Sequence, residues 1–253
     1  MLKHRVIPCL LMLDNGLVKT TRFAKPKYVG DPINAIRIFS DKEVDELMVL
    51  DIGASRESRE PNYELIEQFA GECFMPLCYG GGIRSVEQAR RLFALGVEKI
   101  CLQSAALDDL KIVTRIAEQF GSQSVLVSAD IKSNWLGKHK LYSSKTSKLM
   151  DRSWLTFLKD AVAAGAGEVV LNCVDRDGTM QGMDLDIISE AAAALPVPLI
   201  AVGGASSLQD IKAAVDAGAS AVSAGAMFVF HGPHRAVLIT YPKYRELEQL
   251  FDR

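Results

Sequence analysis

An internal repeat is the feature of this sequence that most restricts how it can fold. The segment PLCYGGGI, which begins at Pro76, is matched by PLIAVGGA, which begins at Pro198, and both are followed at the same distance by a short helix-like stretch that ends in glycine. We also align VLD at 49–51 with VLN at 170–172. A chain that repeats a strand–turn–helix unit in its two halves predicts two fused half-barrels and not an open sheet.

Hydrophobic periodicity predicts the same architecture. Short apolar runs alternate with amphipathic stretches of helical length, as in βαβ units around a parallel sheet. We expect strands at 6–11, 47–52, 76–79, 99–102, 125–129, 168–172, 199–202 and 221–224, and helices at 32–40, 62–70, 85–95, 109–119, 153–164, 184–194, 207–217 and 243–251. The prediction is one (β/α)₈ TIM barrel domain spanning 1–253. An open dinucleotide-binding sheet would need a GxGxxG turn after its first strand, and none stands there.

Composition narrows the classes of partner and compartment. The 253 residues carry a formal net charge of −2, so no basic excess predicts nucleic acid or an anionic membrane. The five cysteines are odd in number and lack CxxC or Cys/His zinc spacing, which indicates reduced core thiols and no metal site. No apolar run reaches the roughly 20 residues of a membrane span, and nothing in the sequence indicates a bound cofactor. We expect a cytoplasmic protein.

Glycine turns at the strand ends predict two phosphate sites. In such barrels the reacting face lies at the carboxyl ends of the strands, where backbone N–H groups hold anions. The first site combines Gly81, Gly82, Gln103 and Ser104; the second combines Asp177, Gly178, Gly203, Gly204, Gly225 and Ala226. Tight turns need glycine anyway, but two such pairs at symmetric positions favour a small molecule with a phosphate at each end.

One carboxylate stands where a general acid or base is expected. Asp130 closes the fifth predicted strand, whereas Leu11 occupies the equivalent position of the first strand. Asp14 could replace the absent carboxylate only if its loop folded inward. Asp51 fits either a site residue or a buried hydrogen-bond anchor.

Two long excursions interrupt the βα pattern. The segment 14–30 carries Lys19 and further basic residues and is longer than usual, which predicts an exposed lid over the site, a solvated basic loop being the alternative. The segment 133–150 predicts a hairpin or flap; its His139 has no partner at ligand spacing.

Four charged residues precede apolar runs at strand starts: Arg5, Glu46, Lys99 and Glu168. Strand-start positions on alternate strands of a barrel point into one layer, so these residues are expected to meet on the axis at the amino-terminal opening. Desolvated charges persist only when paired, which favours a gate for something small and polar. Separate rim ion pairs are the alternative.

Several motifs carry a family resemblance: RVIPCL at 5–10, GDP at 30–32, GGGI at 80–83, FGSQSV at 120–125, DRDGT at 175–179 and GGA at 203–205. Over nearly its whole length the sequence resembles HisF, the cyclase subunit of imidazole glycerol phosphate synthase. The resemblance implies a barrel that binds a bis-phosphate ribonucleotide and receives ammonia from a HisH-like glutaminase at its amino-terminal face. It implies that the four strand-start charges form the ammonia gate and that Asp130 is catalytic.

The departures from that pattern fall on the ring-closure chemistry. Leu11 stands at the position of the family's other catalytic aspartate, and Gln103 and Ala226 replace a phosphate-site asparagine and serine. Further stretches, such as PKYVGDPINA at 26–35, resemble a WbuZ-like paralogue branch associated with glycosyl amidation. That resemblance implies an ammonia-conducting subunit serving a sugar amidotransferase that makes surface polysaccharides. A genuine cyclase/lyase of histidine biosynthesis and a non-catalytic structural partner remain the alternatives.

Overall fold

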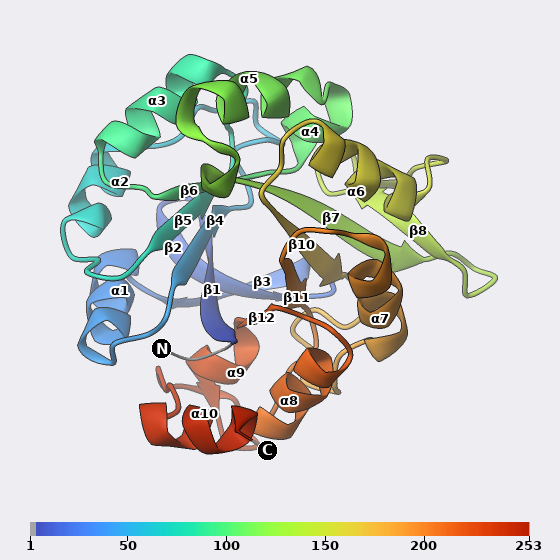
Figure 1. Ribbon diagram of the computed structural model, residues 1–253. Coiled ribbons are helices and arrows are strands. Elements are labelled where there is room, and N and C mark those ends of the chain that lie inside the picture. The colour runs from blue at the N-terminus through green and yellow to red at the C-terminus, as the bar shows by residue number, and fades with distance from the viewer. Residues whose placement is uncertain (1–3, 253) are drawn as a thin grey trace.

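The computed structural model describes residues 4–252, which form a closed barrel of parallel strands surrounded by helices (Figure 1). The barrel strands are β1 (Arg5–Leu13), β4 (Leu47–Asp51), β5 (Leu77–Gly80), β6 (Lys99–Leu102), β7 (Val125–Ser133), β10 (Glu168–Cys173), β11 (Leu199–Val202) and β12 (Ala221–Ala224). Each pairs in parallel with the next, and β1 pairs with β12 to close the ring. The predicted (β/α)₈ barrel is therefore confirmed.

Amphipathic helices cover the outside of this barrel. They are α1 (Pro32–Asp41), α2 (Tyr63–Ala70), α3 (Val86–Ala94), α5 (Lys111–Phe120), α6 (Trp154–Ala163), α7 (Leu185–Ala194), α8 (Leu208–Asp216) and α10 (Tyr244–Phe251). Side chains of Asp31, Ser85, Ser153 and Ser207 cap the first turns of α1, α3, α6 and α8. Two short helices that the sequence did not predict, α4 (Ser104–Asp108) and α9 (Ala226–Val229), begin just after β6 and β12. No helix within residues 4–252 is long and apolar enough to cross a bilayer.

The barrel interior is lined by an apolar cluster of aliphatic and sulfur-containing side chains. Alternation along the strands sends residues such as Val6 and Tyr79 outward, into the core that they share with helix residues such as Phe39 and Phe157. The inward cluster consists of Ile7, Cys9, Met48, Cys78, Cys101, Leu126, Val170, Ile200 and Ala221. All five cysteines are free thiols. Burial raises the pKa of Cys9 to about 12, so the interior thiols are neutral.

The strand ladders correct one of the sequence alignments. Leu11 on β1 pairs with Leu50 on β4, and Asp130 on β7 pairs with Asn172 on β10. The repeat equates Leu77 with Leu199, and these residues pair with Leu47 and Val169. Leu50, not Asp51, is therefore the half-barrel counterpart of Asn172, and the alignment of 49–51 with 170–172 was wrong by one residue. The same ladders place Leu11 at the position equivalent to Asp130.

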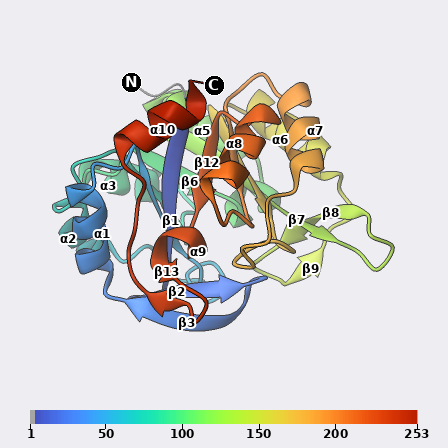
Figure 2. The ribbon, with the colours of Figure 1, turned by 90° about the horizontal axis from the view of Figure 1, so that it is seen from below.

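Antiparallel hairpins extend the carboxyl ends of two barrel strands. The expected exposed loop at 14–30 is instead the hairpin of β2 (Gly16–Thr21) and β3 (Ala24–Gly30), and β2 pairs with β1. Beyond β7, β8 (His139–Ser143) and β9 (Lys148–Leu149) continue the sheet, as the hairpin prediction required. A small sheet of β13 (Phe230–His231) and β14 (Ala236–Val237) follows α9. In Figure 2, β2 and β3 lie across one end of the barrel and α10 lies at the other.

Candidate active-site pocket and charged ring

A pocket opens at the carboxyl ends of the barrel strands, where the sequence placed the reacting face. Among its lining residues are the predicted Leu11, Lys19, Gly81, Gln103, Ser104, Asp130, Asp177, Gly178, Gly203, Gly204, Gly225 and Ala226. Gly82 is not among them. The pocket also contains Thr20, Phe23, Arg56, Ser144 and Lys145, which sequence reasoning missed. Its lower part reaches Cys9, Met48, Cys101 and Val170 of the barrel interior.

Glycine is required by the backbone at both strand-end turns. Gly81 has a φ of +121°, and a Cβ there would lie 2.4 Å from the carbonyl oxygen of Asp51. Gly203 has a φ of +103°, and a Cβ would lie 2.7 Å from the carbonyl oxygen of Cys173. The close approach accounts for these glycines without any ligand. It also leaves bare backbone facing the pocket on two opposite sides of the ring, next to the first residues of α4 and α9.

Asp130 is one of three buried carboxylates that line the pocket, together with Asp51 and Asp177. Its carboxylate accepts hydrogen bonds from Nε2 of Gln103 and, at 3.3 Å, from Nδ2 of Asn172. Gln103 is held in turn by the hydroxyl of Ser144, which donates to its Oε1 at 2.5 Å. Burial raises the pKa of Asp130 to about 7, although both amide hydrogen bonds work against this rise. The side chain can therefore carry or release a proton near neutral pH.

No second carboxylate faces Asp130 from the first strand. β1 and β7 lie on opposite sides of the ring, so Leu11 presents an alkyl side chain across the pocket. Asp14 lies exposed in the β1–β2 turn and does not line the pocket, so the inward-folding alternative was wrong. Asp51 accepts bonds from the N–H groups of Gly53 and Ala54, both at 3.0 Å, and it also lines the pocket, so it fits both the anchor and the site interpretation.

Lys19 corrects the prediction of an exposed lid residue. It is only 7% exposed, and its Nζ lies 2.9 Å from Oδ1 of Asp177. Thr20 donates from Oγ1 to the other oxygen of Asp177 at 3.1 Å. Lys19 is buried because of the tertiary structure. The strand β2 pairs with β1 and lies along the pocket wall, where it contacts the loop after β10. Lys19 thus occupies the pocket as one half of a buried ion pair.

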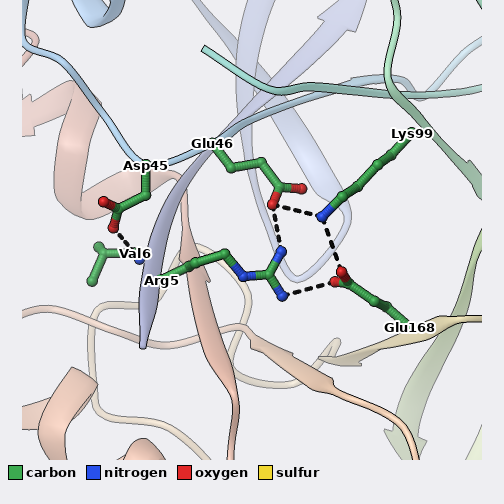
Figure 3. A network of polar contacts seen from close by, with 6 residues as sticks. All are labelled: Arg5, Val6, Asp45, Glu46, Lys99 and Glu168. Atoms are coloured by element: carbon green, nitrogen blue, oxygen red, sulfur yellow. Dashed lines mark hydrogen bonds and ion pairs between the residues drawn. The ribbon is translucent and has the colours of Figure 1, made fainter. Parts of the chain in front are cut away.

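The four strand-start charges converge at the opposite end of the barrel (Figure 3). Arg5 donates to Oε2 of Glu46 at 2.5 Å and to Oε2 of Glu168 at 2.9 Å. The ammonium of Lys99 donates to the same two glutamates, at 2.9 Å each. We call these four residues the charged ring. It is closed, it has no net charge, and each cation bridges both anions.

The charged ring is shaped by burial, by its own ion pairs and by a neighbouring carboxylate. Glu46 is 1% exposed, and its Oε1 has no hydrogen-bond partner among the described residues. Burial lowers the pKa of Lys99, but the ion pairs with Glu46 and Glu168 outweigh it, so the pKa is raised overall. Asp45 accepts from the N–H of Val6 at 3.0 Å and thereby fixes the strand next to Arg5 (Figure 3).

One apolar layer separates the charged ring from the pocket. The members of the inward cluster that do not line the pocket are Ile7, Cys78, Leu126, Ile200 and Ala221. An ion crossing this layer would lose its hydration at a much higher cost than a small neutral molecule. Within residues 4–252, no cluster of His, Cys, Asp and Glu is arranged to hold a metal ion. His139, for which the sequence offered no partner at metal-ligand spacing, lies with its Nε2 atom 3.3 Å from Oδ2 of Asp184.

Comparison with known proteins gives consistent matches over the chain. The family described as histidine biosynthesis protein matches residues 5–234. The chain is 53% identical over 249 residues to the putative imidazole glycerol phosphate synthase subunit hisF2 of Pseudomonas aeruginosa, covering 98% of this chain and 99% of that protein. It is 47% identical over 253 residues to a putative HisF subunit of Leptospira interrogans, covering 99% and 100%. The imidazole glycerol phosphate synthase subunit HisF of Streptococcus sanguinis is 38% identical over 231 residues, 91% of each chain.

Proposed function

Because the chain belongs to the HisF family of histidine biosynthesis proteins, we propose that it is the synthase-type subunit of a glutamine-dependent amidotransferase complex. It receives ammonia from a HisH-like glutaminase at the amino-terminal barrel face and conducts it to the pocket. A sugar amidotransferase then uses the ammonia for a surface-polysaccharide precursor. The observation that carries this proposal is the pairing of a complete charged ring with a pocket that presents Leu11 opposite Asp130.

The two ends of the barrel support the ammonia route. The charged ring offers polar contacts to ammonia arriving from a partner, and its closed state keeps bulk water from entering the bore. The apolar layer above it favours the neutral molecule over ammonium, because burying an unpaired ammonium costs several kcal/mol. Transport requires the charged ring to open, which means breaking the two ion pairs of either Lys99 or Arg5.

The pocket chemistry argues against efficient ring closure by this chain. General acid–base catalysis contributes about 10²–10⁴ in rate per positioned group. Leu11 cannot supply such a group, and Asp130 is held by the amides of Gln103 and Asn172. We assign Asp130 the role of the remaining proton-handling group. The glycine turns and Lys19 would bind a phosphate-bearing small molecule, with the backbone N–H groups as donors.

A genuine cyclase/lyase of histidine biosynthesis is the second candidate. It is favoured by the two glycine turns that open into one pocket and by the pKa of about 7 for Asp130, which suits an acid–base residue. Complementation of a histidine auxotroph that lacks the cyclase separates the two candidates. We expect no growth with this chain, and growth would support the cyclase.

Reconstitution with a HisH-like glutaminase tests the leading proposal. We expect the chain to form a complex with the glutaminase and to stimulate glutamine hydrolysis. Replacing Glu46 with Lys should weaken the complex or its coupling, because it would place three cations around Glu168. A chain that neither binds nor stimulates any such glutaminase would refute the proposal.

A further inference from the structure

The turn that joins β7 to β8 holds a large apolar pair in water. Trp135 is 90% exposed and Leu136 is 58% exposed. The turn is ordered by Asn134, whose Oδ1 accepts from the N–H groups of Leu136 at 3.0 Å and Lys138 at 2.9 Å. Asn134 also donates its own N–H to the carbonyl of Lys138 at 2.9 Å. A rigid turn that presents tryptophan to solvent suits a protein interface, where tryptophan is enriched among the residues that dominate binding energy.

The same hairpin concentrates positive charge. The sequence from 131 to 150 contains five lysines and no acidic residue. Lys132 and Lys140 stand directly opposite each other on the β7–β8 ladder, an arrangement that destabilises a sheet. Lys132 lies 5.0 Å from the centre of the Tyr142 ring. Among the ion pairs of the described residues, only Lys145 of these five lysines takes part, with Asp108. An acidic partner would offset this repulsion.

The position of the hairpin connects it with the pocket. Both ribbon views show the β7–β8 turn reaching beyond the surrounding helices (Figures 1 and 2). The turn after β8 contributes Ser144 and Lys145 to the pocket lining. The strand β8 thus connects the exposed turn at one end with the pocket lining at the other. The charged ring lies at the other end of the barrel, so a glutaminase bound there would not compete.

We infer that the hairpin surface of exposed Trp135, Leu136 and Lys138 and half-buried Lys132 and Lys140 docks the enzyme that consumes the ammonia. That enzyme presents acidic side chains to the lysines and an apolar socket to Trp135. The inference rests on the proposed function, since it assumes that ammonia leaves the pocket for a second protein. It adds the surface that receives that protein and the chemistry of the contact.

The test uses the full complex, purified from its source cells through a tag on this chain. Two variants perturb the hairpin surface: Trp135→Ser, and Lys132→Glu combined with Lys140→Glu. The charge-matched control is Lys111→Glu with Lys159→Glu, on exposed positions of α5 and α6. Glutamine hydrolysis and amidated product are measured for each, at low and high salt. Flotation with phosphatidylglycerol vesicles is measured in parallel.

We expect both hairpin variants to hydrolyse glutamine at the wild-type rate and to form about tenfold less amidated product per glutamine, the effect of losing one dominant interface residue. The loss in the lysine variant should shrink at high salt, and the control should match wild type. Wild-type coupling in both hairpin variants would overturn the docking inference alone. A wild-type complex that makes no glutamine-dependent product would overturn the proposed function and this inference together. Vesicle binding that the variants lose while coupling stays intact would assign the surface to a membrane and overturn the inference.

Discussion

Replacing Lys99 with Met tests whether the charged ring is both an electrostatic unit and a gate. The Lys99 ammonium donates to Glu46 and Glu168, each at 2.9 Å. Its removal leaves these two glutamates with Arg5 as their only ring cation, so the net charge of the charged ring changes from zero to −1. The variant therefore leaves one buried negative charge without compensation.

The magnitude follows from burial. Removing one partner of a fully buried ion pair costs about 3–5 kcal/mol. The Glu46 side chain is 2% exposed, but that of Arg5 is 27% exposed, so solvent screens part of the effect. We expect Lys99→Met to lower the free energy of unfolding by about 2–3 kcal/mol and Tm by about 5–10 °C. Adding Glu168→Gln restores charge balance and should recover more than half of that loss.

The assay separates stability from transport. Chemical denaturation measures the free energy of unfolding, and the reconstituted complex gives amidated product per glutamine hydrolysed. Both Lys99→Met and the charge-balanced double variant should lose product per glutamine, because each leaves the charged ring permanently open, so that bulk water enters the bore and takes up the ammonia. Unchanged stability and unchanged product per glutamine in Lys99→Met would refute the reasoning on both counts.

Further predictions concern the pocket. Burial raises the pKa of Asp130 to about 7, above that of an unfolded aspartate, so its contribution to stability is present at pH 4 and is lost as pH rises through 7. Between pH 4 and 8, denaturation should show wild type losing about 2–4 kcal/mol relative to Asp130→Asn, and parallel pH profiles would contradict this. Leu11→Asp should restore a facing carboxylate and allow growth of a cyclase-deficient histidine auxotroph; failure of the folded variant to do so would show that more than this residue is missing. Lys19→Met should destabilise the fold by about 3–5 kcal/mol and weaken phosphate binding measured by calorimetry, because it leaves Asp177 without its cation. A stable variant with unchanged phosphate affinity would assign Lys19 to neither role.

Much of the barrel was predictable because its signals are local. Apolar runs and cap residues such as Ser85 and Ser207 fix strand and helix positions from neighbours in sequence. The β2–β3 hairpin was not, because β3 is largely exposed and carries no apolar alternation. The hairpin depends on pairing between β2 and β1. The local sequence of 14–30, which predicts a loop, does not reveal that pairing.

The site likewise contains some features that the sequence predicts and others that it does not. The charged ring could be predicted because each member stands at a strand start, where barrel geometry aligns such positions. The burial of Lys19 could not, because its partner Asp177 comes from a loop in the other half of the chain. The same is true of Ser144, which holds Gln103 against Asp130 from the turn after β8. No spacing in the sequence encodes these contacts.

Nitrogen tracing tests the central claim most directly. The complete complex is given glutamine labelled with ¹⁵N in its amide, together with an excess of unlabelled ammonium, and the label in the amidated product is measured by mass spectrometry. Conduction through the barrel predicts a product labelled almost entirely from glutamine, with the label lost in Lys99→Met. A wild-type product in which the label is diluted to the ratio of the free ammonium pool would show that the nitrogen travels through solvent.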